Sequence, residues 1–370
     1  MWLLISVLLF LPSLLIVIKA PTNFLWKLSV LFSEWGYLFA LLSMGWAVVV
    51  GVYNPNPVAL CLALCAACIY AYPLIGGIWI GTRLSKSMKG AFKFDTGPFQ
   101  FSFLTLLKLP QTFGIAPSTH VYFQSEKYSL EFDFYRNNDK SKQPCVLVVH
   151  GGGWDSGDRK QLSELNFYLA SKGIAVASIT YRLAPKYHFP APLDDLRVAR
   201  EYLMQHSESL GIFPDQFFYL GRSAGGQIAL TEAYTHPHLS VKGVIAFYAP
   251  ADMAWGYNFP CWKYVMDSRR VQRDYMGGAP EETGDAYVRA SANRIVKPGL
   301  PPTLMLCGRN DVLTSFHHNT RLMAALTPAG IPHFLLDLPW GVHGFDFHFN
   351  GVSSQLSRYC VEQFVKGAVQ

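Results

Sequence analysis

Charged side chains are almost absent from the first 82 residues of this 370-residue chain, where the exceptions are Lys19, Lys27 and Glu34. Three uncharged apolar runs fill this part: residues 2–18, 35–53 and 58–81. Each approaches the roughly 20 residues that an α-helix needs to cross a bilayer. No charge stands inside the runs to mark an ion path, which argues against a channel or transporter. The sequence predicts a membrane region of about three transmembrane helices over residues 1–82.

The first apolar run is the weakest of the three, because it is short and contains Pro12. It could span the membrane, lie in the interface or act as an uncleaved anchor. No basic residue precedes it and no small-residue cleavage site follows it, which argues against a cleavable signal peptide.

Lysines and arginines near the ends of the runs predict the orientation. The connection after the second run has no charge, whereas basic residues lie between the first two runs and after the third: Lys19, Lys27, Arg83, Lys86, Lys89 and Lys93. We therefore expect an integral membrane protein with its amino terminus outside and residues 83 onward in the cytoplasm. The net charge of +6 is partly juxtamembrane and suits attraction to a membrane surface.

A disulfide framework and a nucleic-acid-binding pattern are also missing. Three of the seven cysteines recur at helical spacing in the third apolar run, where we expect them to pack closely and not to bind metal. The other four are scattered, which fits reduced, buried thiols. No array of basic and aromatic residues suggests a nucleic-acid partner.

The charged part of the chain divides at about residue 120. We expect residues 83–119 to form a juxtamembrane or cap segment. Its Phe-rich stretch, 93–119, suits an interfacial helix or a flap over a site. A linker that packs on the next domain is the alternative. From residue 120 to 370, short β-branched or aromatic runs alternate with helical patterns. This alternation predicts an α/β fold with a mostly parallel, doubly wound sheet. Residues 253–298 break the rhythm and read as a helical lid insertion.

The sequence GRSAGG, residues 221–226, lies between a strand-like run and a helical pattern. GxSxG in this context predicts a nucleophile elbow, in which glycines two residues before and after the serine relieve crowding at a tight turn. We expect Ser223 to present its hydroxyl at the end of the strand as a nucleophile.

A serine nucleophile needs a base, and the base needs an orienting acid. His343 follows the last predicted strand in a glycine-flanked loop, whereas His348 lies in an aromatic run that favours packing; His317 and His318 near a helix start read as surface residues. Asp311 follows the penultimate strand and is the favoured acid.

Two other carboxylates compete for the role of the acid. Asp252 follows the strand before and is the runner-up, and Asp337 stands inside a strand-like run.

Three consecutive glycines follow the apolar run CVLVV in the stretch HGGGW. A loop without side chains can pass close to a substrate and aim its amides at an oxyanion. We expect Gly152 and Gly153, with the amide of Ala224, to form an oxyanion hole. His150 and Gly151 would support the loop.

These motifs resemble the hormone-sensitive-lipase-like branch of the α/β-hydrolase fold. The resemblance rests on HGGGW, YRLAP (181–185), FPAPLDD (189–195), GRSAGG, GRND and GVHGF, which together cover about residues 120–370. It implies a carboxylic-ester hydrolase without metal or organic cofactor, and a structural role for Arg182 with Asp194 or Asp195. The amino-terminal segment, which usually contributes to the cap of that family, leads here into the apolar runs.

The sequence therefore predicts a membrane-anchored serine esterase or lipase that acts on acyl esters or lipid-derived substrates. A small-acyl deacetylase and a lipid-linked methylesterase use the same chemistry and stay open. A non-catalytic membrane scaffold with a hydrolase fold is the alternative from another class.

Overall fold

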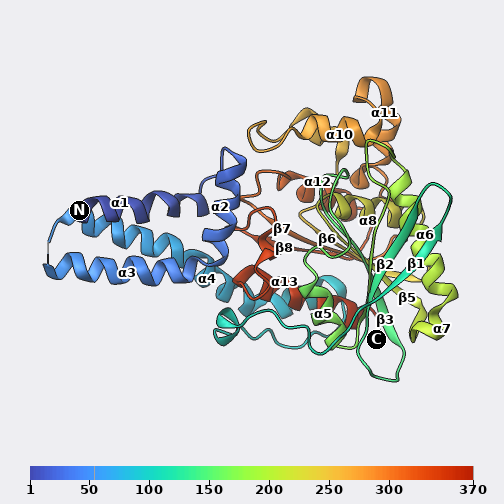
Figure 1. Cartoon of the computed structure of the whole chain (residues 1–370), viewed down its shortest axis with the longest axis horizontal. Coiled ribbons are helices and arrows are strands. Elements are labelled where there is room, and N and C mark those ends of the chain that lie inside the picture. The colour runs from blue at the N-terminus through green and yellow to red at the C-terminus, as the bar shows by residue number, and fades with distance from the viewer. Residues whose placement is uncertain (54, 370) are drawn as a thin grey trace.

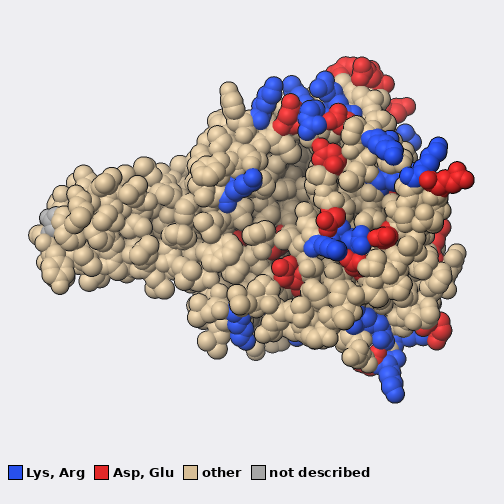
Figure 2. Space-filling model, viewed as in Figure 1, with Lys and Arg blue, Asp and Glu red and all other residues tan. Residues whose placement is uncertain are grey.

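The computed structural model describes residues 1–53 and 55–369 and has two parts. A lobe of three helices projects from a larger α/β body (Figure 1). The lobe consists of α1 (Trp2–Ser13), α3 (Gly36–Tyr53) and α4 (Pro57–Phe92). On the face drawn in Figure 2 the lobe carries no Lys, Arg, Asp or Glu. The short helices η1 (Leu14–Ile16) and α2 (Asn23–Glu34) lead from α1 to α3, and α2 lies where the lobe meets the body.

All three predicted apolar segments are helical, but they differ in length. Helices α3 and α4 are long and apolar enough to cross a membrane, whereas the segment Trp2–Ile16 is shorter. A core helix of a protein outside the membrane can be equally long and apolar, but it is mostly buried. In α3 and α4, only 22% and 33% of the most apolar 18-residue stretch is buried within the chain. The exposed apolar surface of the lobe suits contact with lipid.

The boundary expected at residues 82–83 falls inside α4, which continues without a break to Phe92. Leu84, Met88 and Phe92 are spaced four residues apart and are buried, so this half of the helix packs on the body. Gly77 permits the close approach, because a Cβ there would lie 2.2 Å from Cγ1 of Val352. The apolar helix of the lobe and the first support of the body are therefore one element.

The body is built on one sheet of eight strands in the order β1-β2-β4-β3-β5-β6-β7-β8. Strands β1 and β2 are antiparallel, β2 is antiparallel to β4, and the other pairs are parallel. The strands are β1 (Ser118–Gln124), β2 (Ser129–Tyr135), β3 (Gln143–Val149), β4 (Ala175–Ile179), β5 (Ile212–Arg222), β6 (Val241–Phe247), β7 (Thr303–Gly308) and β8 (His333–Leu338). The predicted doubly wound α/β sheet is confirmed.

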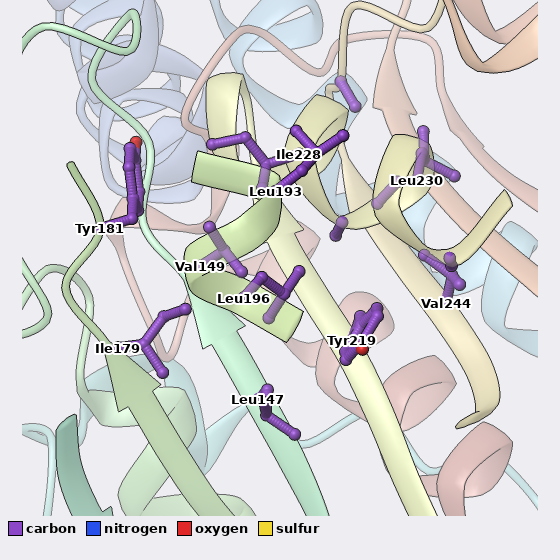
Figure 3. Packing of buried hydrophobic residues seen from close by; sticks show 14 of the residues in the cluster. Leu147, Val149, Ile179, Tyr181, Leu193, Leu196, Tyr219, Ile228, Leu230 and Val244 are labelled. Atoms are coloured by element: carbon purple, nitrogen blue, oxygen red, sulfur yellow. The ribbon is translucent and has the colours of Figure 1, made fainter. Parts of the chain in front are cut away.

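Helices cover both faces of the sheet, which explains the continuous apolar strands. In β3, Leu147 and Val149 face one core, while Val146 and Val148 face the other. Figure 3 shows the first core, where Leu193 of α6 and Ile228 of α8 lie over the strands. The helices of the body are α5 (Glu164–Ser171), α6 (Ala191–Gln205), α7 (Ser207–Leu210), α8 (Ala224–Thr235), α12 (His317–Leu326), the short η4 (Phe345–Phe347) and α13 (Val352–Ala368).

The expected lid insertion lies between β6 and β7. It contains three short α-helices and one 3₁₀ helix: α9 (Met253–Asn258), α10 (Ser268–Met276), α11 (Pro280–Arg289) and η3 (Ala292–Arg294). Before β1 begins at Ser118, the stretch 93–119 contains only η2 (Leu104–Leu107). It packs along α13, where the amide of Gly97 donates to Gln363 and Ser102 exchanges hydrogen bonds with Gln355. Other apolar side chains of the stretch are exposed, namely Phe103, Leu104, Leu107 and Leu109. Its role as an interfacial or cap segment therefore stays a prediction.

Candidate active site

Ser223 lies at the turn between β5 and α8, in a backbone conformation that few side chains adopt (φ 52°, ψ −118°). Glycines make this turn possible. A Cβ on Gly221 would lie 2.0 Å from the carbonyl oxygen of Gly225, and a Cβ on Gly225 would lie 2.2 Å from that of Val149. The close packing of these glycines therefore holds Ser223 in its strained backbone conformation, as is common at functional positions.

A chain of two hydrogen bonds links Ser223, His343 and Asp311. Nε2 of His343 lies 3.0 Å from Oγ of Ser223, and its Nδ1 lies 2.8 Å from Oδ2 of Asp311. The other carboxylate oxygen of Asp311 accepts from the amides of Leu313 and Thr314, both at 2.8 Å. These amides fix the carboxylate, which in turn fixes the imidazole.

Asp252, the runner-up for the acid, belongs to a separate buried cluster. Its carboxylate accepts from the amide of Trp255 and from Asn293, Arg294 and Arg321, at 2.8–3.2 Å. Burial alone would raise the pKa of Asp252, but these hydrogen bonds and guanidinium charges hold it below its ordinary value. The carboxylate therefore caps α9 and ties the lid to α12.

Two other histidines are packed in the structure. His318 is buried, not exposed as the sequence suggested; its Nδ1 accepts from the amide of Asp252, and burial lowers its pKa to about 4. His348 stacks on Trp35 with ring centres 4.1 Å apart, and burial lowers its pKa to about 4 as well.

The glycine loop after β3 turns its backbone toward Ser223. Gly152 has φ 122°, and a Cβ there would lie 2.1 Å from the carbonyl oxygen of Ser156, so only glycine fits. The amide of Gly151 donates to Gln161 at 2.8 Å. Within residues 1–53 and 55–369, the amides of Gly152 and Gly153 have no protein acceptor. Ala224 is the first residue of α8, where helical amides lack partners as well.

His150 supports this loop from inside the body. Its ring stacks on Tyr181 at 4.3 Å, Nδ1 lies 2.8 Å from the carbonyl oxygen of Gly151, and the hydroxyl of Tyr181 donates to the carbonyl of His150. Burial lowers the pKa of His150, which favours the neutral form of its ring.

A second buried network lies behind the nucleophile. Arg222 donates to Asp346 at 2.6 Å, and the hydroxyl of Tyr248 donates to the other oxygen of the same carboxylate at 2.6 Å. The ring centres of Tyr248 and His343 lie 4.5 Å apart. This network braces both sides of the contact between Ser223 and His343.

These groups open into a cavity of about 1460 Å³. That volume exceeds the roughly 300–1,000 Å³ of a typical small-molecule site. Its walls come from the glycine loop, the lid and, unexpectedly, α2 of the amino-terminal segment. Residues 93–119 contribute nothing to it. Within the described residues, no group of three or more His, Cys, Asp or Glu side chains is arranged to hold a metal.

Helix α2 reaches the reacting groups directly, because Nε1 of Trp26 donates to the carbonyl of His343 at 3.1 Å. This contact, which was not predicted from the sequence, joins residues 317 positions apart. A local signal was present: Trp26, Val30 and Leu31 recur at helical spacing beside Lys27, as expected for an amphipathic helix.

Comparisons with known proteins agree with this architecture. The chain is 32% identical over 190 residues to versiconal hemiacetal acetate esterase of Dothistroma septosporum, covering 49% of this chain and 56% of that protein. It is 33% identical over 133 residues to arylacetamide deacetylase of Bos taurus, covering 34% and 33%. The matches thus span about half and one third of these relatives.

Solved structures share the fold. A bacterial heroin esterase superposes with a TM-score of 0.62 at 23% identity, covering 70% of this chain and 86% of that one. An esterase of Pyrobaculum calidifontis superposes with a TM-score of 0.60 at 20% identity, covering 78% and 92%. The model of the family described as BD-FAE matches residues 132–326, which is more than half of the chain. The protein therefore belongs to the BD-FAE family and has the α/β-hydrolase fold.

Proposed function

We propose that this protein is a membrane-anchored carboxylic-ester hydrolase in which Ser223 is the nucleophile. The observation that carries the proposal is the hydrogen-bonded series Ser223–His343–Asp311 at the wall of a large cavity. The esterases and deacetylase among its relatives support the same reaction class. The motifs HGGGW, YRLAP and GVHGF favour the hormone-sensitive-lipase-like branch.

The geometry suits acyl transfer in two steps. Oγ of Ser223 attacks the ester carbonyl carbon while Nε2 of His343 takes its proton. The amides of Gly152, Gly153 and Ala224 receive the oxyanion. His343 then gives the proton to the leaving alcohol, and a water molecule, activated by the same imidazole, releases the carboxylic acid from Ser223.

Asp311 acts through His343. Because its carboxylate accepts from Nδ1–H, it leaves Nε2 free as the proton acceptor and favours the imidazolium that forms during attack. Arg182 and Asp195 have no part in the chemistry: their ion pair at 2.7 Å joins the YRLAP loop to α6.

Labelling with a fluorophosphonate tests the nucleophile. We expect wild-type protein to be labelled and Ser223→Ala to be unlabelled. Ser315→Ala is the matched control, since Ser315 lines the same cavity and should not affect labelling. Folded wild-type protein that resists the probe would favour the non-catalytic scaffold instead.

Helices α1, α3 and α4 anchor the protein in this proposal, with the hydrolase body on the cytoplasmic side. All the basic residues near the lobe lie at its body end or beyond, as the positive-inside rule requires of a cytoplasmic body. A reporter that is active on only one side of the membrane, fused to the carboxyl terminus, should indicate a cytoplasmic location. Reporter activity on the opposite side would contradict this orientation.

A further inference from the structure

One face of α2 lines the cavity beside Ser223. The cavity-lining residues of this segment recur at three- and four-residue intervals: Asn23, Trp26, Lys27, Val30, Leu31 and Trp35. The opposite face is buried, and Phe32 packs there against Phe39 and Tyr70. Four of these six side chains are apolar, and they face the cavity beside Ser223 together with Asn23 and Lys27.

Helix α2 also joins the reacting groups to the lobe. Near its start, Trp26 donates to the carbonyl of His343, and at its end Glu34 accepts from Oγ of Ser353 at 2.7 Å. The next residues lead into α3. An extended apolar chain lying along α2 would thus run between Ser223 and the lobe.

The rim beside the start of α2 is aromatic and exposed. The amide of Asn23 donates to the carbonyl of Tyr264 at 3.0 Å, and its side chain donates to the carbonyl of Val265 at 3.1 Å, so the lid loop is tied to α2. Tyr264 is 82% exposed and the neighbouring Phe24 is 67% exposed. Phe259 and Trp262 of the same loop are also exposed.

Exposed aromatic side chains are unfavourable in water but are enriched where a protein meets the membrane interface. Here they belong to α2 and to the lid loop tied to it, and α2 lies where the lobe meets the body (Figure 1). Their continuity with the apolar lobe identifies a lipid surface as the occupant of this rim.

We propose that the cavity takes long-chain acyl esters directly from the bilayer, with the acyl chain lying along the apolar face of α2 and the ester carbonyl at Ser223. This inference rests on the proposed ester hydrolysis. Ester and water give a fatty acid and an alcohol, with no other reactant. The aromatic rim, Phe24 and Tyr264, keeps the entrance in the membrane interface.

The test uses the full chain in phosphatidylcholine vesicles with two fluorogenic esters. 4-Methylumbelliferyl oleate is presented in the bilayer, and 4-methylumbelliferyl acetate is presented in water. The double variant Phe24→Ser/Tyr264→Ser removes two exposed aromatic rings that do not line the cavity. Leu239→Ser is the matched control, because Leu239 is 93% exposed but lies in the connection between α8 and β6.

We expect the rim variant to lower kcat/KM for the oleate about tenfold, equivalent to the loss of about 1.4 kcal/mol of interfacial binding, and to leave acetate hydrolysis unchanged. Leu239→Ser should change neither. Equal loss on both esters, or no loss on the oleate, would overturn the role of the rim. Wild-type protein that hydrolyses only the acetate would overturn the inference but keep the proposed ester hydrolysis. Protein that hydrolyses neither ester would contradict both.

A second variant tests the path of the acyl chain. Val30→Trp places a larger ring on the cavity face of α2 and should lower the ratio of oleate to butyrate turnover about tenfold, in line with the 1–3 kcal/mol that a hydrophobic subsite discriminates. An unchanged ratio would mean that the acyl chain does not follow α2.

Discussion

Replacing Glu34 by Gln should make the stability of this protein less dependent on pH. Glu34 ends α2 in a fully buried position, where its carboxyl accepts from Oγ of Ser353, which in turn accepts from Nε1 of Trp340. Burial, with a smaller contribution from the Asp346 charge, raises its pKa from 4.5 to about 8. The folded protein therefore holds this proton more tightly than the unfolded chain does.

The sign and size of the effect follow from proton linkage. The stabilisation is fully present below pH 4.5 and is lost as the pH rises toward about 8. At about 1.36 kcal/mol per pH unit, the loss between pH 5.5 and 8 is about 3 kcal/mol. Unfolding entropy of about 2.1 cal/mol/K per residue over 370 residues converts this to a Tm difference of ~4 °C.

Thermal unfolding of detergent-purified protein at pH 5.5 and pH 8 measures this difference. The Tm of Glu34→Gln relative to wild type should rise by ~4 °C between pH 5.5 and pH 8, since glutamine keeps the hydrogen bond from Ser353 but does not titrate. Glu126→Gln, in the exposed turn between β1 and β2, is the control and should leave both values unchanged. If the difference in Tm between wild type and Glu34→Gln is the same at both pH values, Glu34 is already ionised in the folded protein.

The remaining predictions concern the active site and are read from hydrolysis of a soluble ester. Asp311→Asn should lower kcat by a factor of about 10³–10⁴, because Nδ1 of His343 loses its acceptor. Asp252→Asn should instead lower Tm and change kcat less than about tenfold, since it breaks ion pairs of the lid. The opposite pattern would exchange their roles. Gly152→Ala should lower kcat at least ~100-fold with an unchanged circular dichroism spectrum, because the loop cannot keep its amides aimed. Trp26→Phe should lower kcat/KM about tenfold through loss of the hydrogen bond to the carbonyl of His343, and an unchanged value would exclude a positioning role for α2.

Much of the sheet and the grouping of site residues could be predicted from the sequence, because the controlling signals are local. A glycine two residues before and after Ser223 is required by the turn itself, and His343 and Asp311 follow strands that end at the same edge. Neither position depends on knowing how distant segments meet.

The features that could not be predicted from the sequence depend on distant contacts. Whether 93–119 or α2 would cover the cavity was decided by partners in α13 and in the loop of His343. The continuation of α4 past residue 82 was hidden by its lysines, because Lys86 and Lys89 occupy the exposed face while Leu84, Met88 and Phe92 pack inward. Composition marks such a stretch as juxtamembrane, whereas its helical periodicity marks it as part of the core.

Because α4 is one helix from the lobe into the body, the body is mounted on a stiff support and not on a flexible tether. At 1.5 Å per residue its 36 residues extend about 54 Å, nearly twice the ~30 Å of a bilayer core. In the proposed membrane-anchored form, the hydrolase body would be held at a set height and tilt above the lipid. Its search for substrate would then be lateral diffusion in two dimensions, in which lipid ahead of the rim is sampled continuously.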